Sequence, residues 1–296
     1  NRFPKGLPQA LVNAREVEMN QLKTLYISDL DGTLLNKSAE VSIFTEKSLC
    51  RLIESGMNFS VATARTAATT LQMVSGIPIH VPVILMNGAS IYDIQNSTYV
   101  KTYFIEKPSV QQLFSAIKRH HAAGFNYIIK DDILSTWYEQ INSDHTLRFV
   151  EERIQKYGKQ FAQIDDFSGL ADKPVLYYSV CDVKEKLVPL QEELCKIEDL
   201  HIEFYRDVYE DGFWYLEACS VHASKYNAVN FLREEYGFDK VVSFGDNLND
   251  LPMFLASDES YAVANAKPEV KEKATSVIPG NDEDGVVKWL LDRFQL

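Results

Sequence analysis

The sequence is poor in cysteine and has no long apolar run, and each deficit excludes a class of protein. Its four cysteines, at positions 50, 181, 195 and 219, show neither C-x-x-C spacing nor histidine partners at zinc-finger distances. We therefore expect buried or incidental thiols. No apolar segment is long enough to span a bilayer, and the first twenty residues lack the apolar core of a signal peptide, so we expect a cytoplasmic protein.

Positive charge is also in short supply. The chain carries 30 lysines and arginines against 42 aspartates and glutamates, for a net charge of −12. This balance opposes general binding to nucleic acid or to an anionic membrane surface. A ligand that carries phosphate must then be held by local positive groups or by a metal ion.

The length of the chain favours two domains. At 296 residues it is near the size at which a single core stops growing. Apolar residues make up 46% of it, which is typical of a globular protein. Residues 1–18 have no clear periodicity, and we expect residues 1–22 to form an N-terminal extension. Residues 1–18 are either a short docking segment or residues left from cloning, with Met19 as the natural start.

The most informative stretch runs from Leu25 to Leu35. An apolar run stops at Asp29 and Asp31, and a Gly-Thr turn follows. Residues i and i+2 on a strand point the same way, so we expect the side chains of Asp29 and Asp31 to converge on one small volume. Two such anions repel each other unless a cation or a shared proton intervenes, so the stretch indicates Mg²⁺. A plain Asp-Gly hairpin is disfavoured because a helical pattern, and not a second strand, comes next.

Three further apolar runs also end in polar residues. Residues 57–61 lead to Thr63 and Arg65, residues 82–86 lead to Asn87, and residues 240–244 lead to a Gly-Asp-Asn-Leu-Asn-Asp segment. Helical patterns lie between several of these runs, which predicts an open parallel sheet with crossover helices. In such a sheet ligands bind at the carboxyl edge, so we expect the polar residues to form one site there.

The middle of the chain differs in its residue pattern. Strand-like runs rich in aromatic residues occur at 125–129, 174–180, 201–205 and 213–217, with helical patterns among them. This order fits a mixed sheet with helices on one side, inserted into the first domain. We expect a core of residues 23–88 and 219–296 and an inserted cap of residues 89–218.

Four motifs in this order resemble those of the haloacid dehalogenase-like phosphatases. They are Asp29-Leu30-Asp31-Gly32-Thr33, Thr63, Lys225 and Gly245-Asp246-Asn247-Leu248-Asn249-Asp250. The large insertion between the second and third motifs resembles the Cof-type, class IIB branch. The resemblance implies an α/β fold, with a Rossmann-like parallel-sheet core domain and an inserted α+β cap domain. It also implies a Mg²⁺-dependent phosphoric monoester hydrolase.

The resemblance assigns roles to the matching residues. Asp29 is expected to be the nucleophile that forms an aspartyl-phosphate, and Asp31 the acid and then the base of the two steps. Thr63 is expected to donate hydrogen bonds to the phosphoryl oxygens. Lys225 is expected to neutralise the phosphoryl group and to keep Asp29 ionised. Without the two acidic motifs, the preferred interpretation of Thr63 is an ordinary strand residue, and that of Lys225 is a solvated charge on a helix.

The resemblance also implies a metal site and substrate contacts. Mg²⁺ is expected to bind the Asp29 carboxylate, the Asp31 carbonyl oxygen and Asp246, with Asp250 binding it or orienting a water. An acidic helix N-terminus is the other interpretation of the segment from Asp246 to Asp250, and the two are compatible. The expected substrate contacts are Arg65, Asn87 and Asn249, although Asn87 fits a simple turn equally well. His222 is interpreted as a loop histidine.

The resulting hypothesis is a phosphatase acting on a small phosphorylated metabolite, most plausibly a sugar phosphate. Phosphatases for flavin precursors or pyridoxal phosphate are alternatives within the same branch. A phosphomutase of the same superfamily is the nearest rival enzyme. From another class, the fold could serve as a non-catalytic metabolite-binding module. The sequence does not fix the oligomeric state.

Overall fold

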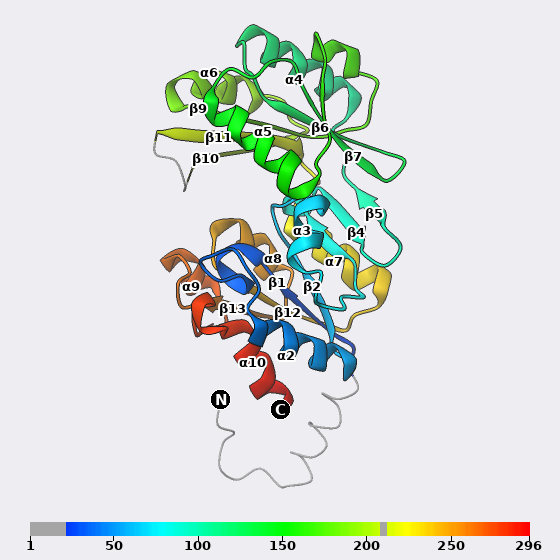
Figure 1. Cartoon of the computed structure of the whole chain (residues 1–296), viewed down its shortest axis with the longest axis vertical. Helices are drawn as coiled ribbons and strands as arrows, with labels where there is room; N and C mark the ends of the chain where they lie inside the picture. Colours follow the sequence, from blue (N-terminus) through cyan, green and yellow to red (C-terminus); the bar gives the residue numbers. More distant parts are fainter. Residues whose placement is uncertain (1–21, 208–211) are drawn as a thin grey trace. The chain divides into compact units, whose positions relative to one another are not determined.

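The computed structural model describes residues 22–207 and 212–296 (Figure 1). Its internal contacts divide the chain into two units. One consists of the residues up to Ser60 together with Val229–Leu296, and the other of Val61–Ala228. All but the last residue of the predicted extension at 1–22 lies outside the described residues, and the predicted domain limits at 88 and 219 stay predictions.

The first unit is built on a five-stranded sheet in the order β14-β13-β12-β1-β2. The pairs β1/β12, β12/β13 and β13/β14 are parallel. Consecutive residues of the central strands are buried, as expected for a parallel sheet covered on both faces. The strands are β1 (Thr24–Ser28), β2 (Asn58–Val61), β12 (Lys240–Gly245), β13 (Glu259–Val263) and β14 (Ser276–Ile278).

Helix α2 (Ile43–Glu54) shows why the helices form where they do. The Ser42 side chain accepts a hydrogen bond from the Thr45 N–H at 3.0 Å and so caps the first turn. Leu49 and Leu52 are fully buried, and the chain leaves the helix at Gly56. Most of α7 (Lys225–Tyr236), which begins in the second unit, also belongs to this unit. The other helices of the first unit are α8 (Leu251–Leu255), α9 (Pro268–Lys273) and α10 (Gly285–Phe294).

The strand predicted at 82–86 pairs with a neighbour on each edge. As β3 (Val83–Leu85) it pairs antiparallel with β4 (Ser90–Asp93), which in turn pairs with β5 (Thr98–Thr102). Asn87 and Gly88 both have positive φ, at 53° and 96°, so the chain reverses immediately after β3. That reversal makes a hairpin with β4. On its other edge Ile84 forms a parallel bridge with Ala62, the residue after β2, so β3 also runs parallel to the continuation of β2, as expected. Helix α3 (Ala67–Met73) lies between β2 and β3.

The second unit also contains a six-stranded sheet in the order β10-β11-β9-β6-β7-β8. Its pairs are antiparallel except for β7/β8, which confirms the predicted mixed sheet. The strands are β6 (Phe125–Lys130), β7 (Ile133–Tyr138), β8 (Phe161–Gln163), β9 (Val175–Val183), β10 (Leu200–Arg206) and β11 (Phe213–Ser220).

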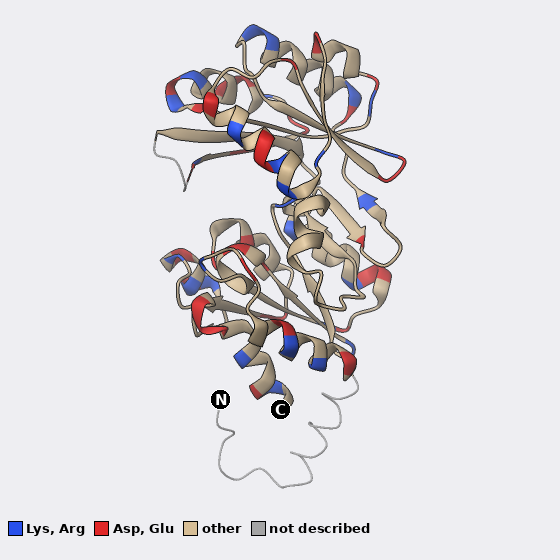
Figure 2. Ribbon diagram, viewed as in Figure 1, with Lys and Arg blue, Asp and Glu red and all other residues tan. Residues whose placement is uncertain are grey.

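The two faces of this sheet differ. Tyr178, Val180 and Leu216 point to one face, where they share a core with α4 (Lys107–Arg119) and α6 (Lys184–Leu194). On the other face α5 (Asp144–Tyr157) packs Phe149 against Phe125, with ring centroids 5.7 Å apart, so the expectation that the helices lie on one side of this sheet is wrong. These three helices carry charges of both signs, whereas the strands carry few (Figure 2). In the part of the chain that the structure describes, no helix has the length and apolarity to cross a membrane.

Candidate active site

Three carboxylates meet at the edge of the parallel sheet where β1 and β12 end. The two strands are adjacent and parallel, and the Asp29 N–H donates to the Phe244 carbonyl at 2.9 Å. Carboxylate oxygens of Asp29, Asp246 and Asp250 lie within 4.8 Å of one another. Asp29 is only 5% exposed and Asp250 is fully buried. The predicted grouping of Asp29 with the acidic segment after β12 is therefore present in the first unit.

Asp250 is held by the backbone of the turn that it follows. Its Oδ2 accepts hydrogen bonds from the N–H groups of Asp246 at 2.9 Å and Asn247 at 3.0 Å. A Cβ atom on Gly245 would lie 2.7 Å from the Asp250 carboxyl, so only glycine fits there. The Asn247 side chain caps the short helical turn Leu248–Asp250. The segment does begin a short helical turn, as the helix N-terminus interpretation predicts, and its metal-binding role stays a prediction.

Asp246 is positioned by residues to which the sequence analysis gave no role. The Thr33 hydroxyl donates to Asp246 Oδ1 at 3.0 Å, and the Lys267 N–H donates to the Asp246 carbonyl at 2.9 Å. The Asn265 side-chain amide donates to the Gly32 carbonyl at 2.7 Å. Asn265 follows the buried strand β13, so the signal that identified the other polar residues at strand ends was available for it too.

Asp31 lies in a turn and not on a strand. Strand β1 ends at Ser28, and Leu30–Leu34 form a tight turn in which Gly32 has φ of +78°. The expectation that Asp29 and Asp31 point the same way because of strand alternation is wrong for this reason. Among the described residues, the three-acid group does not include the Asp31 carboxylate, which is half-buried.

The donor set of the three-acid group fits a hard divalent cation. Burying several carboxylates together is costly unless a positive charge compensates them. Mg²⁺ takes oxygen ligands, binds through a few carboxylates and keeps several waters. The Thr33 hydroxyl and the two backbone N–H groups on Asp250 fix the orientation of two of these acids. The group therefore offers the donors that such an ion takes.

In the second unit a set of backbone hydrogen bonds surrounds the fully buried Thr63. Its N–H donates to the Ile84 carbonyl at 2.9 Å, and its carbonyl accepts from the Asn87 N–H at 3.0 Å. Its Oγ1 accepts from the Arg65 N–H at 3.1 Å. The structure thus brings together the predicted substrate contacts at 63, 65 and 87. Their predicted approach to the acids of the first unit stays a prediction, as does the role of the half-buried Asn249.

Lys225 is 1% exposed at the first position of α7, so it is not a solvated charge. The turn that follows β3 packs directly against the start of α7. A Cβ atom on Gly88 would lie 2.2 Å from the Ser224 carbonyl carbon and 2.7 Å from the Lys225 nitrogen. A buried ammonium group is costly unless an anion accompanies it, and a helix N-terminus favours negative charge as well. This end of α7 is therefore suited to an anionic group.

The side chain of Asn87 reaches an acidic pair on the six-stranded sheet. Its amide donates to Glu203 Oε2 at 3.3 Å, and Glu203 stands directly opposite Glu217 in the β10/β11 ladder. Like charges in that position repel. Burial raises the pKa of Glu217 to about 7. Hydrogen bonds from the hydroxyls of Tyr177 at 2.6 Å and Ser179 at 3.2 Å act in the opposite direction and lower this pKa. The sequence contained both strands but not their register, so this pair was not predicted.

Most of the chain is similar to known phosphatases. The profile of the haloacid dehalogenase-like hydrolases matches residues 26–290. A 5-amino-6-(5-phospho-D-ribitylamino)uracil phosphatase of Bacillus subtilis is 26% identical over 288 residues, with 88% of this chain and 95% of that protein covered. A pyridoxal phosphate phosphatase of Escherichia coli is 22% identical over 266 residues, with the same coverage of 88% and 95%.

The fold is similar to that of a solved sugar phosphatase of haloacid dehalogenase subclass IIB. The TM-score is 0.67 at 21% identity, with 92% of this chain and 99% of that one covered. The fold class predicted from the sequence, the resemblance to the Cof-type, class IIB branch and the enzyme class of phosphoric monoester hydrolase are confirmed. The chain belongs to the haloacid dehalogenase-like hydrolases.

Proposed function

We propose that this protein is a Mg²⁺-dependent phosphatase that hydrolyses a small phosphorylated metabolite through an aspartyl-phosphate on Asp29. The observation that carries the proposal is the convergence of Asp29, Asp246 and Asp250 at the carboxyl ends of two adjacent parallel strands. Membership of the hydrolase family supports the same reading. A bound Mg²⁺ would supply positive charge next to the phosphoryl oxygens and offset the repulsion between them and the three acids.

In the first step an Asp29 carboxylate oxygen attacks phosphorus. The new bond is between Asp29 Oδ and phosphorus, and the bond that breaks joins phosphorus to the ester oxygen of the substrate. Asp31 gives its proton to that departing oxygen, so the leaving group departs as a neutral alcohol. The left-handed turn at Gly32 supports this assignment, because it separates Asp31 from the strand and from the three-acid group.

In the second step water replaces Asp29. Asp31, now ionised, takes a proton from a water molecule, whose oxygen attacks phosphorus while the Asp29–phosphorus bond breaks. Inorganic phosphate leaves and both acids return to their starting states. Splitting the reaction in this way is useful because uncatalysed hydrolysis of phosphate monoesters is extremely slow, and enzymes reach accelerations of about 10²¹ for it.

Thr63 and Lys225 take the phosphoryl-binding roles in this proposal. The burial of both side chains supports it, because neither is placed to interact mainly with bulk water. Lys225 contributes a fixed positive charge at a helix N-terminus, and Thr63 lies in a rigid set of backbone hydrogen bonds. Arg65, Asn87 and Asn249 are assigned to the substrate side.

Replacing Asp29 with Asn is the decisive test. The change removes the nucleophile while keeping the size of the side chain, so hydrolysis of p-nitrophenyl phosphate should fall to background with circular dichroism and thermal unfolding unchanged. Turnover at the wild-type rate in Asp29→Asn would reject the covalent mechanism. Removing divalent ions with a chelator should abolish activity in the wild type, and added Mg²⁺ should restore it.

We propose a sugar phosphate, or another polyol phosphate, as the substrate class. One relative acts on a ribityl phosphate and a protein of similar fold is a sugar phosphatase, which supports a hydroxyl-rich leaving group. A panel of phosphorylated metabolites assayed for phosphate release, including pyridoxal phosphate and sugar phosphates, tests this. A substrate with kcat/KM at least about tenfold above the rest would identify the class, and a preference for pyridoxal phosphate would overturn it.

A further inference from the structure

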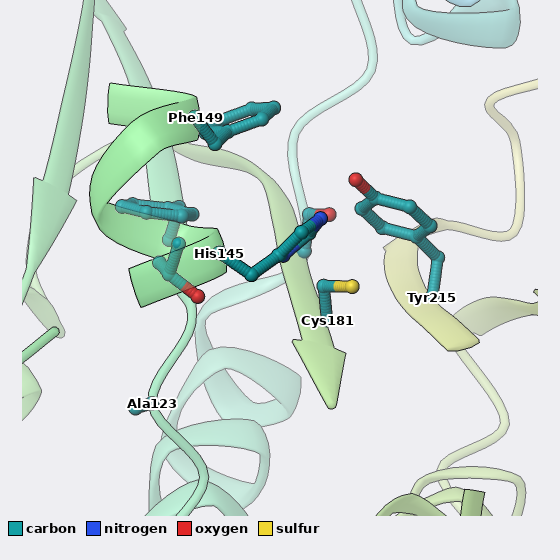
Figure 3. A pocket seen from close by; sticks show the side chains of 8 residues that line it. Ala123, His145, Phe149, Cys181 and Tyr215 are labelled. Atoms are coloured by element: carbon teal, nitrogen blue, oxygen red, sulfur yellow. The ribbon is translucent and has the colours of Figure 1, made fainter. Parts of the chain in front are cut away.

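A second group of convergent side chains lies in the second unit. Its residues are distant in sequence from Thr63 and Lys225, and their side chains are of other chemical types. It consists of His145 in the first turn of α5, Cys181 in β9 and Asp207 directly after β10. Ligand atoms of all three lie within 4.8 Å of one another, and His145 Nε2 is 3.8 Å from Asp207 Oδ2. Figure 3 shows the side chains of His145 and Cys181 turned toward each other and toward Tyr215.

The surrounding structure fixes these side chains. The His145 ring stacks on Phe213 with centroids 4.7 Å apart and planes 15° from parallel. Cys181 is paired with Tyr215 in the β9/β11 ladder. The Asp207 N–H donates to the Phe213 carbonyl at 2.9 Å, and Asp207 is only 7% exposed. The three donors are thus presented by two strands and a helix that are already packed together.

We propose that His145, Cys181 and Asp207 form a binding site for a borderline-soft divalent cation, with Zn²⁺ as the ion that best fits these donors. Imidazole nitrogen, thiolate sulfur and carboxylate oxygen are the three kinds of ligand that Zn²⁺ takes in proteins. The thiolate and the carboxylate together neutralise its charge. The group in the first unit offers only carboxylate oxygen, so the two sites select different metals.

The geometry is close to what such an ion needs. Bonds of about 2.0–2.3 Å in a tetrahedral site place neighbouring donors about 3–4 Å apart, so the observed spread of up to 4.8 Å closes with small side-chain rotations. A cavity of about 20 Å³ adjoins the group and is lined by His145, Cys181 and Tyr215. That is room for about one water molecule, which can serve as the fourth ligand beside three protein donors.

This inference does not depend on the proposed phosphatase activity, and its test reads metal binding directly. The full chain is freed of metal under reducing conditions and titrated with Co²⁺ in the presence of excess Mg²⁺. We expect a near-ultraviolet thiolate-to-Co²⁺ charge-transfer band that saturates at one Co²⁺ per chain and disappears when Zn²⁺ is added. Absence of the band in the wild type overturns the proposal.

Two variants and a matched control assign the band to these residues. It should vanish in Cys181→Ser, and Co²⁺ affinity should fall at least about tenfold in Asp207→Asn. Cys195→Ser removes a free cysteine that is exposed, at the end of α6, and should leave the band unchanged. A band that persists in Cys181→Ser contradicts the site, as does a band that is lost in Cys195→Ser.

Thermal unfolding separates lost binding from lost folding. A ligand that binds only the folded state raises the melting temperature, so Zn²⁺ should raise Tm in the wild type and in Cys195→Ser. Cys181→Ser should melt at its own metal-free temperature whether or not Zn²⁺ is present. If Cys181→Ser does not fold, His145→Gln takes its place, and an undiminished rise in Tm with Zn²⁺ in that variant refutes the proposal.

Discussion

The two large sheets carry their polar chemistry in different places. In the parallel sheet the acids stand in turns beyond the strand ends, where backbone N–H groups and glycines hold them, as at Asp250 and Gly245. In the six-stranded sheet the polar groups stand on the face of the strands, and register alone brings Glu203 opposite Glu217. Changes in the first region should therefore act through backbone geometry and metal binding, and changes in the second through charge.

The sharpest test of the first region is Asp250→Ala. The variant loses a carboxylate from the three-acid group and leaves the N–H groups of Asp246 and Asn247 without their acceptor. We expect kcat/KM for an aryl phosphate to fall by at least about a hundredfold, with a higher Mg²⁺ requirement. Asp282→Ala, which removes a more exposed acid of the same unit, should keep the wild-type rate. Equal rates in both variants would show that Asp250 has no such role.

Gly32→Ala tests whether backbone geometry controls the acids. Gly32 has φ of +78°, and an added Cβ atom would lie 2.6 Å from Asp246 Oδ2. Gly56→Ala is the matched control, because Gly56 has φ of +96° with nothing within 4 Å. Both variants should lose about 1–2 kcal/mol in urea unfolding from the left-handed backbone. Only Gly32→Ala should also lose activity, by about tenfold or more. A similar activity in the two would argue against steric control of Asp246.

Glu217→Gln tests the second region through pH. Burial raises the pKa of Glu217 in the folded state from 4.5 to about 7, so the folded state binds this proton more tightly than the unfolded state does. The stability that this proton confers is fully present below pH 4.5 and is lost as pH rises to about 7. Gln does not titrate, so the variant should gain about 3 kcal/mol relative to the wild type over this range.

The measurement for Glu217→Gln is urea unfolding at pH 5, 6, 7 and 8. Glu235→Gln, an exposed acid on α7, should track the wild type at every pH. If the difference between Glu217→Gln and the wild type does not grow between pH 5 and pH 7, the acidic pair does not titrate as the structure indicates. The Tyr177 hydroxyl can still donate to the Gln carbonyl, so loss of that hydrogen bond does not confuse the result.

The smallest effect is expected for Thr33→Val. The change removes one hydrogen bond to Asp246 Oδ1 without changing the shape of the side chain. A hydrogen bond of this kind is worth about 1 kcal/mol, or about fivefold in an equilibrium constant. The Mg²⁺ concentration for half-maximal activity should rise by about that factor. Thr33→Ser keeps the hydroxyl and should restore the wild-type value. If Val and Ser behave alike, the hydroxyl does not orient Asp246.

The sequence was most informative where local pattern and chemistry coincide. Apolar runs that end in acids located β1 and β12, and the parallel register then made Asp29 and Asp246 neighbours. It was less informative where a single turn decides the path. Positive φ angles at three consecutive residues after β3, Met86, Asn87 and Gly88, lead the chain into the hairpin with β4, and the turn at Gly32 takes Asp31 off the strand.

Groupings that depend on register or on distant packing were beyond reach from one sequence. Cys181 and His145 are 36 positions apart, in a strand and a helix whose packing no local pattern specifies. The four cysteines looked incidental because zinc-finger spacing is a sequence signal, whereas a site assembled from three elements has none. The four cysteines differ in exposure, from the buried Cys219 to the exposed Cys195.

Two main-chain N–H groups donate hydrogen bonds to the Asp250 carboxylate and so restrict which side chain position 250 can hold. Because these donors and the space left by Gly245 are both set by the main chain, the pocket accepts a side chain with one methylene and no more. A glutamate there would push its carboxyl past both donors and toward Asp246. The turn after β12 thus selects aspartate over glutamate at position 250 by the length of the side chain.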